Sequence, residues 1–206
     1  DSINGPLAFP QTIQNQFTMS VAVFDGAMAN KAALLDYQHN FFKDTAELAS
    51  QDDLTGLLNR RAGYQQFEQQ LQLAQRHQCS LAVALLDIDF FKRINDGCGH
   101  QVGDQVLQQV AQQLSSRLRR TDVLMRWGGE EFLLLMPHTA LLDGHHLCQQ
   151  LRQQLHDCLW PGSIESVTIS IGLTALQSDS GTITELIHKA DQALYRAKAH
   201  GRDRIV

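Results

Sequence analysis

The sequence predicts an α+β fold after residue 50, in which helices pack against a central mixed β-sheet. Segments with apolar residues at helical spacing alternate there with short apolar runs, in the order αβααββαβα. Two of the short runs, residues 123–127 and 132–136, lie on either side of Gly128-Gly129. Paired glycines between two apolar runs are typical of a hairpin turn, so these runs are predicted to be antiparallel strands.

The helices are predicted from their apolar spacing. In residues 102–118, apolar side chains recur every four positions from Val106 to Leu118. The other helices are expected at residues 63–77, 140–159 and 182–200. The last one ends at Gly201, and glycine is common in the left-handed position that follows a helix.

Three further strands complete the sheet. Residues 80–86 are continuously apolar, which indicates a central strand that is covered on both faces. Residues 166–176 alternate apolar and other side chains, the pattern of a strand with one buried face. Residues 204–206 are predicted to form a short closing strand.

Residues 1–50 are predicted to be a leader and a helical stalk, the end of a truncated upstream sensor region, and residues 51–206 to be a separate domain. Alternating apolar residues at 17–23 indicate a short strand. Leu34, Phe41 and Leu48 recur every seven residues, which is the spacing of a dimerising coiled coil. A single amphipathic helix packed on its own domain has the same spacing, so both interpretations stay open.

Composition restricts the possible partners. The chain has 206 residues and a net charge of −5, so a polymeric nucleic acid is not an expected partner. Its four cysteines form no C-x-x-C pair and there is no secretory segment, which favours reduced thiols in the cytoplasm. No apolar run is long enough to cross a membrane. The first residue is not Met, so an upstream sensor or membrane span stays open.

Two groups of carboxylates predict a metal site. Glu130 and Glu131 follow the glycine pair, and a rigid turn that carries acids can hold a hard cation while glycine lets a phosphate approach the backbone. Asp87 and Asp89 follow the apolar run at 80–86, where burial is costly unless the carboxylates are paired or bind a metal. The alternative for the aspartates is a loop with a surface salt bridge, but the two groups together favour Mg²⁺.

Two further pairs of residues suggest a nucleotide. Asn95 and Asp104 could bind a guanine edge, because a carboxylate accepts from the ring N–H and the amino group that adenine lacks. Asp104 could instead simply favour the start of the helix at 102–118. Lys198 and Arg202 are four residues apart and could both reach a triphosphate, although cations also favour the C-terminal end of any helix.

The segment from Arg126 to Phe132, Arg-Trp-Gly-Gly-Glu-Glu-Phe, closely resembles the signature of the GGDEF family of bacterial diguanylate cyclases in its GGEEF form. Four other segments resemble the family in the same order. They are the opening segment at 52–61, the Asp-Ile-Asp-Phe-Phe-Lys segment at 87–96, the glycine-rich pairs Gly99-His100 and Gly103-Asp104, and the closing helix from Ala193 to Arg202. The resemblance covers about residues 51–206.

The resemblance implies an α/β sandwich with a mostly antiparallel sheet, like class III nucleotide cyclases and polymerase palms. It implies that two GTP molecules condense to cyclic di-GMP with release of two pyrophosphates. Each domain of a homodimer would bind one GTP, with two Mg²⁺ or Mn²⁺ ions in each half-site. It also implies a bacterial cytoplasmic location, either alone or as the cytoplasmic domain of a membrane-anchored sensor.

The family motifs imply a role for each matching residue. The metal would be bound by Asp87, Glu130 and the Ile88 carbonyl, with Glu131 as a further ligand or base. Guanine would be selected by Asn95 and Asp104, between Leu54 and Leu107. The phosphates would be bound by backbone N–H groups of Phe90, Phe91, Gly128 and Gly129 and by the side chains of Lys92, Lys198 and Arg202. Arg126 would stabilise charge in the transition state.

Arg119 and Asp122 form an R-x-x-D pattern that resembles the family's inhibitory product site. Arginine can bind guanine and phosphate while the aspartate accepts from the guanine edge. A solvated charge pair at a helix end is the alternative. Relatives often add an arginine on the next helix, where this chain has Gln150 and, two residues later, Arg152.

Two other functions remain open. A catalytically silent receptor for GTP or cyclic di-GMP would use the same binding residues, but such relatives usually lack a signature acid or a guanine contact. A different cyclase or a polymerase-like transferase could use the same scaffold, although Asn95 and Asp104 argue for guanine.

Overall fold

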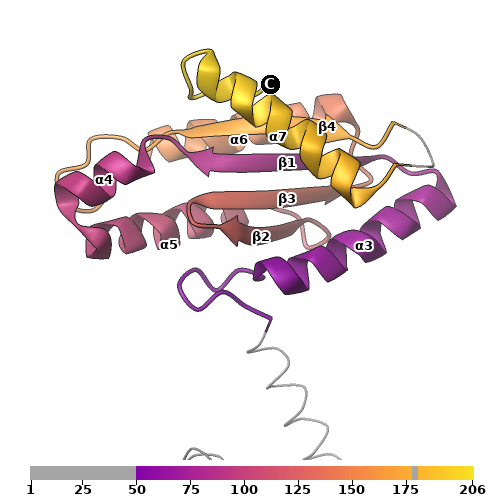
Figure 1. Ribbon diagram of the computed structural model, residues 1–206, viewed down its shortest axis with the longest axis horizontal. Coiled ribbons are helices and arrows are strands. Elements are labelled where there is room, and N and C mark those ends of the chain that lie inside the picture. Colours follow the sequence, from indigo (N-terminus) through magenta and orange to yellow (C-terminus); the bar gives the residue numbers. More distant parts are fainter. Residues whose placement is uncertain (1–49, 178–180) are drawn as a thin grey trace, which may run out of the picture. The chain divides into compact units, whose positions relative to one another are not determined.

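The computed structural model describes residues 50–177 and 181–206 (Figure 1). The chain divides into two units, residues 1–49 and 50–206, and only the second is described here apart from residues 178–180. The leader, the short strand and the stalk that the sequence predicts before residue 50 lie outside the described residues. Within the described ranges, no helix is long and apolar enough to span a lipid bilayer.

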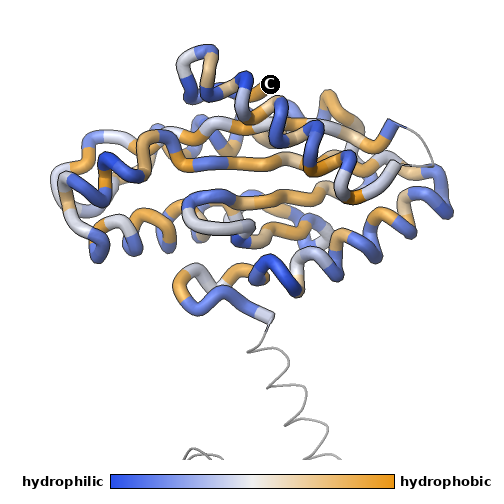
Figure 2. Tube along the Cα trace, viewed as in Figure 1, coloured by the Kyte–Doolittle hydropathy of each residue, from blue (hydrophilic) through white to orange (hydrophobic). Residues whose placement is uncertain are grey.

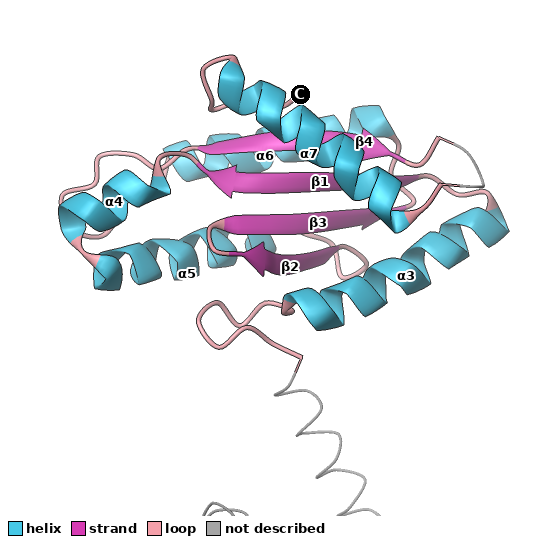
Figure 3. Cartoon of the chain, viewed as in Figure 1, coloured by secondary structure: helices cyan, strands magenta, loops and turns pink. Residues whose placement is uncertain are grey.

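The described unit contains helices on both faces of one antiparallel sheet (Figure 3). Its elements are α3 (Arg60–His77), β1 (Leu81–Ile88), α4 (Phe91–Cys98), α5 (His100–Ser116), β2 (Val123–Gly128), β3 (Glu131–Pro137), α6 (Leu141–His156), β4 (Ile169–Ala175) and α7 (Ile183–Ala199). The strand order is β2-β3-β1-β4, and each neighbouring pair is antiparallel. The predicted α+β class and order of elements are confirmed.

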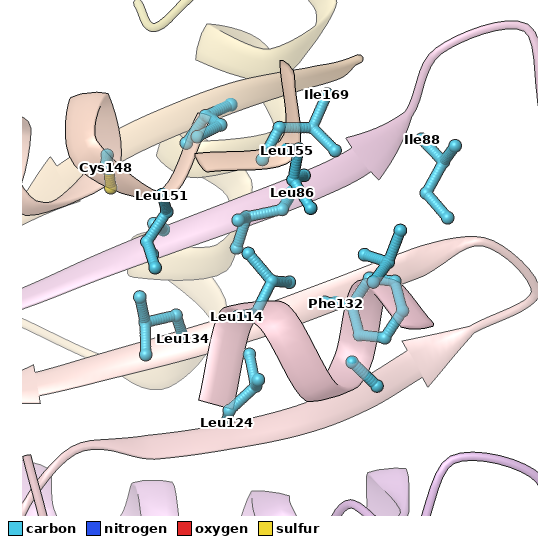
Figure 4. Packing of buried hydrophobic residues seen from close by; sticks show 14 of the residues in the cluster. Leu86, Ile88, Leu114, Leu124, Phe132, Leu134, Cys148, Leu151, Leu155 and Ile169 are labelled. Carbon is cyan, nitrogen blue, oxygen red and sulfur yellow. The ribbon is translucent and has the colours of Figure 1, made fainter. Parts of the chain in front are cut away.

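Strand alternation gives the sheet two buried faces. In β1, Leu81, Val83 and Leu85 pack with residues of α3 and α7. The intervening residues Ala82, Ala84, Leu86 and Ile88 face the other core, which α5 and α6 cover. Figure 4 shows the second core, in which Leu86 and Phe132 lie near Leu114 of α5 and Leu151 of α6. Since helices cover both faces, β1 is buried along its whole length and is apolar except at Asp87 (Figure 2).

The chain end adds a short parallel pairing to β4. Ile205 bridges Ile171, with hydrogen bonds from Ile171 N–H to the Arg204 carbonyl and from Val206 N–H to the Ile171 carbonyl. Residues 204–206 thus run beside β4 as predicted, but the contact is an isolated bridge and not a strand, and all four strands of the sheet pair antiparallel rather than in the predicted mixed arrangement. Gly201 has φ +108 and follows α7 as predicted. The Arg202 N–H donates to the Ala197 carbonyl and the Gly201 N–H to Lys198, which is the Schellman arrangement.

Several element boundaries differ from the prediction. The residues after β1 form a separate helix, α4, which the predicted order of elements includes without bounds. Helix α5 begins at His100, two residues early, so its first turn contains no acidic side chain. Helix α6 ends at His156, and β4 begins only at Ile169. The hairpin turn is shifted by one residue: Gly128 ends β2, and the turn consists of Gly129 and Glu130.

Candidate functional site

The candidate metal site begins where β1 and β3 run side by side. Asp87 lies directly opposite Glu131 in the register of these strands, and the Ile88 N–H donates to the Glu130 carbonyl at 3.3 Å. Side chains directly opposite on antiparallel strands have Cβ atoms about 4.5–5.5 Å apart, so two carboxylates come together on one face. The structure therefore brings Asp87, Ile88, Glu130 and Glu131 to the same end of the sheet.

Helix α7 supplies a cation to this end of the sheet. Lys198 Nζ lies 2.7 Å from Asp87 Oδ2, and the Asp87 side chain is only 9% exposed. Burial raises the pKa of Asp87 to about 6, and the charges of Glu130 and Glu131 add to this effect while Lys198 opposes it. Burial also raises the pKa of Glu131, again against the opposing charge of Lys198. One lysine does not balance the three carboxylates.

These groups fit a divalent cation of the hard, oxygen-binding kind. Like charges on opposite strand positions are destabilising, so a cation bound near Asp87 and Glu131 would stabilise this pair. Carboxylate and backbone carbonyl oxygens are the donors that Mg²⁺ takes. Among residues 50–177 and 181–206, no three acidic, histidine or cysteine side chains are already arranged around a metal position. The oxygen donors are present, but Asp87 is turned toward Lys198.

Asp89 has a different environment from Asp87, although the sequence suggested the same one. It accepts hydrogen bonds from Ser170 Oγ at 2.6 Å, Thr168 Oγ1 at 2.8 Å and the Asp203 N–H at 3.0 Å. These donors satisfy the buried carboxylate without a metal. Asp89 therefore ties the end of β1 to β4 and to the segment after α7.

The hairpin turn is held by Arg126 of β2, which also binds Asp52 before α3. Gly129 has φ +51, a conformation that favours glycine, at the first central position of the two-residue turn. Arg126 Nε donates to the Gly129 carbonyl at 3.0 Å, and its Nη1 lies 3.0 Å from Asp52 Oδ1. In this structure Arg126 supports the turn, and its predicted role in the transition state stays a prediction.

The start of α4 is suited to bind an anion. Phe90, which precedes the helix, has φ +56, an uncommon conformation for a bulky residue that marks many functional sites. Its side chain makes no capping hydrogen bond. Since the first N–H groups of a helix have no carbonyl partner within it, those of Phe91 and Lys92 can bind phosphate. The guanidinium groups of Arg93 and Arg202 each lie 4.5 Å from the centre of the Phe90 ring.

The predicted guanine contacts come together between α4 and α5. A Cβ atom on Gly103 would collide with the Asn95 side-chain oxygen, so Asn95 lies against the turn of α5 that carries Asp104. Asp104 is exposed and is the fifth residue of α5, so the alternative of a first-turn helix acid is wrong. Leu107 is buried on the same helix. Gln108 Nε2 donates to the Leu54 carbonyl at 3.2 Å, which brings Leu54 to α5 as well.

The R-x-x-D segment lies beside a separate hollow. Arg119 N–H donates to Asp122 Oδ2 at 2.8 Å, and both residues line a cavity of about 270 Å³. Arg117, His146 and Gln150 line it too. Arg152 is not among them, and its Nη1 lies 2.8 Å from Asp203 Oδ1. The position suggested for a second arginine is therefore held by Gln150.

Sequence reasoning missed two contributors to the site. Asp52 was only part of the opening segment, yet it binds Arg126, and it also accepts from Thr55 N–H at 2.9 Å and Thr55 Oγ1 at 2.7 Å. An aspartate three residues before a threonine is a recognisable turn signal. Arg93 lies beside Phe90, and nothing in its sequence context indicated this stacking.

The antiparallel sheet with an acid-bearing hairpin has known counterparts. Residues 49–204 match the family model "Diguanylate cyclase, GGDEF domain". The chain therefore belongs to the GGDEF family, as its motifs predicted.

Individual relatives agree with this assignment. Diguanylate cyclase DgcP of Pseudomonas aeruginosa is 43% identical over 169 residues, which cover 81% of this chain and 25% of that protein. The chain thus spans a quarter of the length of this curated relative.

Solved structures extend the comparison to the fold. The coiled coil and GGDEF domain of DgcB from Caulobacter crescentus, in complex with c-di-GMP, gives a TM-score of 0.82 at 26% identity, over 89% of this chain and 98% of that one. The active GGEEF domain of a diguanylate cyclase from Vibrio cholerae gives a TM-score of 0.69 at 34% identity, over 72% of this chain and 96% of that one.

Proposed function

We propose that this chain is a diguanylate cyclase, which condenses two GTP molecules into cyclic di-GMP and two pyrophosphates. The observation that carries the proposal is the meeting of Asp87, Glu130 and Glu131 at one end of the sheet, beside Lys198 of α7. The relative from Vibrio cholerae, described as active, has the same GGEEF form of the motif. GTP as the substrate supports a cytoplasmic location.

Each residue group has a separate task in the proposed reaction. Asn95 and Asp104 bind the guanine edge, beside Leu54 and Leu107. The N–H groups at the start of α4 and in the Gly128-Gly129 segment bind phosphate oxygens. Lys92, Lys198 and Arg202 neutralise the triphosphate, and Arg126 keeps the turn in place. Mg²⁺ or Mn²⁺, two ions per half-site, would activate the attacking hydroxyl and stabilise the leaving pyrophosphate.

The chemistry needs two copies of the domain. The 3′-oxygen of each GTP forms a bond to the α-phosphorus of the other GTP, while the bond from that phosphorus to the bridging oxygen of pyrophosphate breaks. Each attacking hydroxyl loses its proton, and each pyrophosphate takes the bonding electron pair. Because one domain holds one GTP in this scheme, the working unit is a homodimer in which two sites face each other.

The test is product formation from GTP. The chain is incubated with GTP and Mg²⁺, the nucleotides are separated, and cyclic di-GMP is expected. Glu130→Gln, which keeps the shape and removes the charge, should abolish it, whereas the exposed acid change Glu68→Gln on α3 should not. Activity per molecule should rise with protein concentration, since two copies must meet. Bound but intact GTP at every concentration would favour the silent receptor instead.

We also propose that the hollow at Arg119 and Asp122 binds the product and inhibits synthesis. The 270 Å³ cavity that both residues line supports this, as does the cyclic di-GMP in the DgcB complex. Arg119→Ala should relieve inhibition by added cyclic di-GMP without lowering the initial rate. Gln150→Arg should strengthen inhibition, because it adds a phosphate-binding cation to the cavity wall. Unchanged inhibition in both variants would refute this site.

A further inference from the structure

Lys198 lies among the carboxylates that are proposed to bind the metal. Its ammonium group is 2.7 Å from Asp87 Oδ2 in a pair whose carboxylate side is nearly buried. Burial raises the pKa of Glu131, which stands opposite Asp87 on β3, and the same ammonium opposes this effect. Lys198 therefore provides the positive charge that this pair of like charges needs when no other cation is present.

We infer that Lys198 takes the place of the metal ion in the nucleotide-free protein and makes metal binding depend on the nucleotide. This rests on the proposed function. An ammonium at 2.7 Å and a divalent ion at about 2.0–2.1 Å from the same carboxylate oxygen repel each other, so Lys198 weakens metal binding while it stays paired with Asp87. A metal ion at Asp87 therefore binds more tightly once Lys198 has moved away.

A bound triphosphate gives Lys198 another partner. Its terminal phosphates carry more negative charge than one carboxylate, and Lys198 lies at the end of α7, close to the segment after β1. When the ammonium moves to phosphate, Asp87 becomes free for the metal. Nucleotide and metal then strengthen each other's binding by the same factor, because such coupling is reciprocal.

Arg202 provides the contrast. It belongs to the same predicted phosphate-binding pair, but its guanidinium lies 4.5 Å from the centre of the Phe90 ring. It can leave this ring for a phosphate without exposing a metal ligand. Removal of Arg202 should therefore weaken nucleotide binding only, whereas removal of Lys198 should also change how the protein binds a free metal ion.

The experiment titrates the protein with Mn²⁺ alone and follows free Mn²⁺ by electron paramagnetic resonance. It is done at about pH 8, above the pKa of about 6 that burial gives Asp87. Lys198→Met should tighten binding of free Mn²⁺ about tenfold, as expected for removal of one close, partly buried competing charge. Lys198→Gln is the second variant, and circular dichroism verifies that each is folded. Arg202→Met should bind free Mn²⁺ as the unchanged chain does.

The second arm measures coupling with guanosine 5′-(α,β-methylene)triphosphate, which cannot release pyrophosphate. In the unchanged chain this nucleotide should tighten Mn²⁺ binding, because its phosphates bind the metal and because it draws Lys198 away from Asp87. In Lys198→Met only the first contribution is left, so the tightening should be about tenfold smaller. Free Mn²⁺ affinity that is unchanged or weaker in both Lys198 variants would overturn the inference. Neither measurement involves turnover, so a failure of this inference would not bear on whether the chain makes cyclic di-GMP. Conversely, a chain that made no cyclic di-GMP could still show the predicted Mn²⁺ binding.

Discussion

Arg126 joins the hairpin that carries the acids to Asp52, which lies 74 positions earlier in the chain. Both oxygens of Asp52 lie within 3.1 Å of Arg126 Nη1, and Arg126 Nε binds the Gly129 carbonyl. Asp52 also starts the turn that leads into α3, through its hydrogen bonds with Thr55. The entry of the chain into the domain is thus connected directly to the turn that holds Glu130.

Asp52→Asn should lower stability in a pH-dependent way. Burial alone raises the pKa of Asp52, but the hydrogen bonds from Thr55 and the charge of Arg126 outweigh it, so the net pKa is lowered. The ionised form therefore stabilises the fold above the pKa of the unfolded chain, and this contribution is lost as the pH falls through the folded pKa. Urea unfolding should show a loss of about 1 kcal/mol at pH 7 that shrinks toward pH 3.

The neighbouring Asp53→Asn is the matched control, since Asp53 is exposed. It should change the free energy of unfolding little at any pH. An Asp52→Asn loss that stays constant down to pH 3 would show that the charge of Asp52 is not what binds Arg126.

Asp87→Asn should have the opposite effect on stability while it removes metal binding. Burial raises the pKa of Asp87 to about 6, so the ionised carboxylate destabilises the fold at neutral pH. A raised folded pKa means that the folded state holds the proton more tightly, so the penalty is full above pH 6 and disappears below about pH 4. In the presence of a chelator, the variant should be more stable by about 1–3 kcal/mol at pH 7, measured by urea unfolding.

The gain should vanish below about pH 3, where Asp87 is protonated in both states. Mn²⁺ should stabilise the unchanged chain and not the variant, because only the former keeps the buried carboxylate. A variant that is less stable than the unchanged chain at pH 7 would mean that the ion pair with Lys198 stabilises the fold by more than the burial of the ionised Asp87 carboxylate costs.

Local patterns predicted the elements of this domain, because apolar spacing depends only on neighbouring residues. The continuously apolar run before Asp87 predicted β1, and Gly201 marked the end of α7. The boundaries at Gly128 and His100 were missed by one or two residues, since hydrogen bonds rather than side-chain patterns set them. The different environments of Asp87 and Asp89 could not be predicted either. They depend on partners 79 to 114 positions away for Asp89 and on Lys198 for Asp87.

Asp104→Ala should weaken binding of GTP and leave binding of ATP unchanged. Asp104 is exposed beyond the first turn of α5, near the Asn95 side chain, so its carboxylate is free to accept from a guanine edge. Loss of a charged hydrogen-bond acceptor should reduce GTP affinity by about tenfold to a hundredfold, measured by isothermal titration calorimetry. Gln105→Ala, the exposed neighbour on the same helix, should leave both affinities unchanged. Equal loss of GTP and ATP affinity would argue against selection of guanine by this residue.

Gly172→Ala tests how closely α7 must approach the sheet. A Cβ atom at this position in β4 would collide with the Ala190 carbonyl oxygen and the Leu194 backbone nitrogen, and it would lie 2.9 Å from Leu194 Cα. Backbone atoms cannot yield as a flexible side chain does, so α7 must shift as a whole. The free energy of unfolding should fall by about 2–3 kcal/mol. Because α7 also carries Lys198, GTP affinity should fall in the molecules that remain folded.

Gly97→Ala in α4 is the matched control for this substitution. A Cβ atom at Gly97 would have no atom within 4 Å, and the residue lies inside a helix. Alanine should therefore stabilise the domain there by about 0.5–1 kcal/mol, since it restricts the unfolded chain without any collision. Thermal and urea unfolding of both variants measure the contrast. If the two alanines had the same effect, close contact between β4 and α7 would not be what requires glycine at position 172.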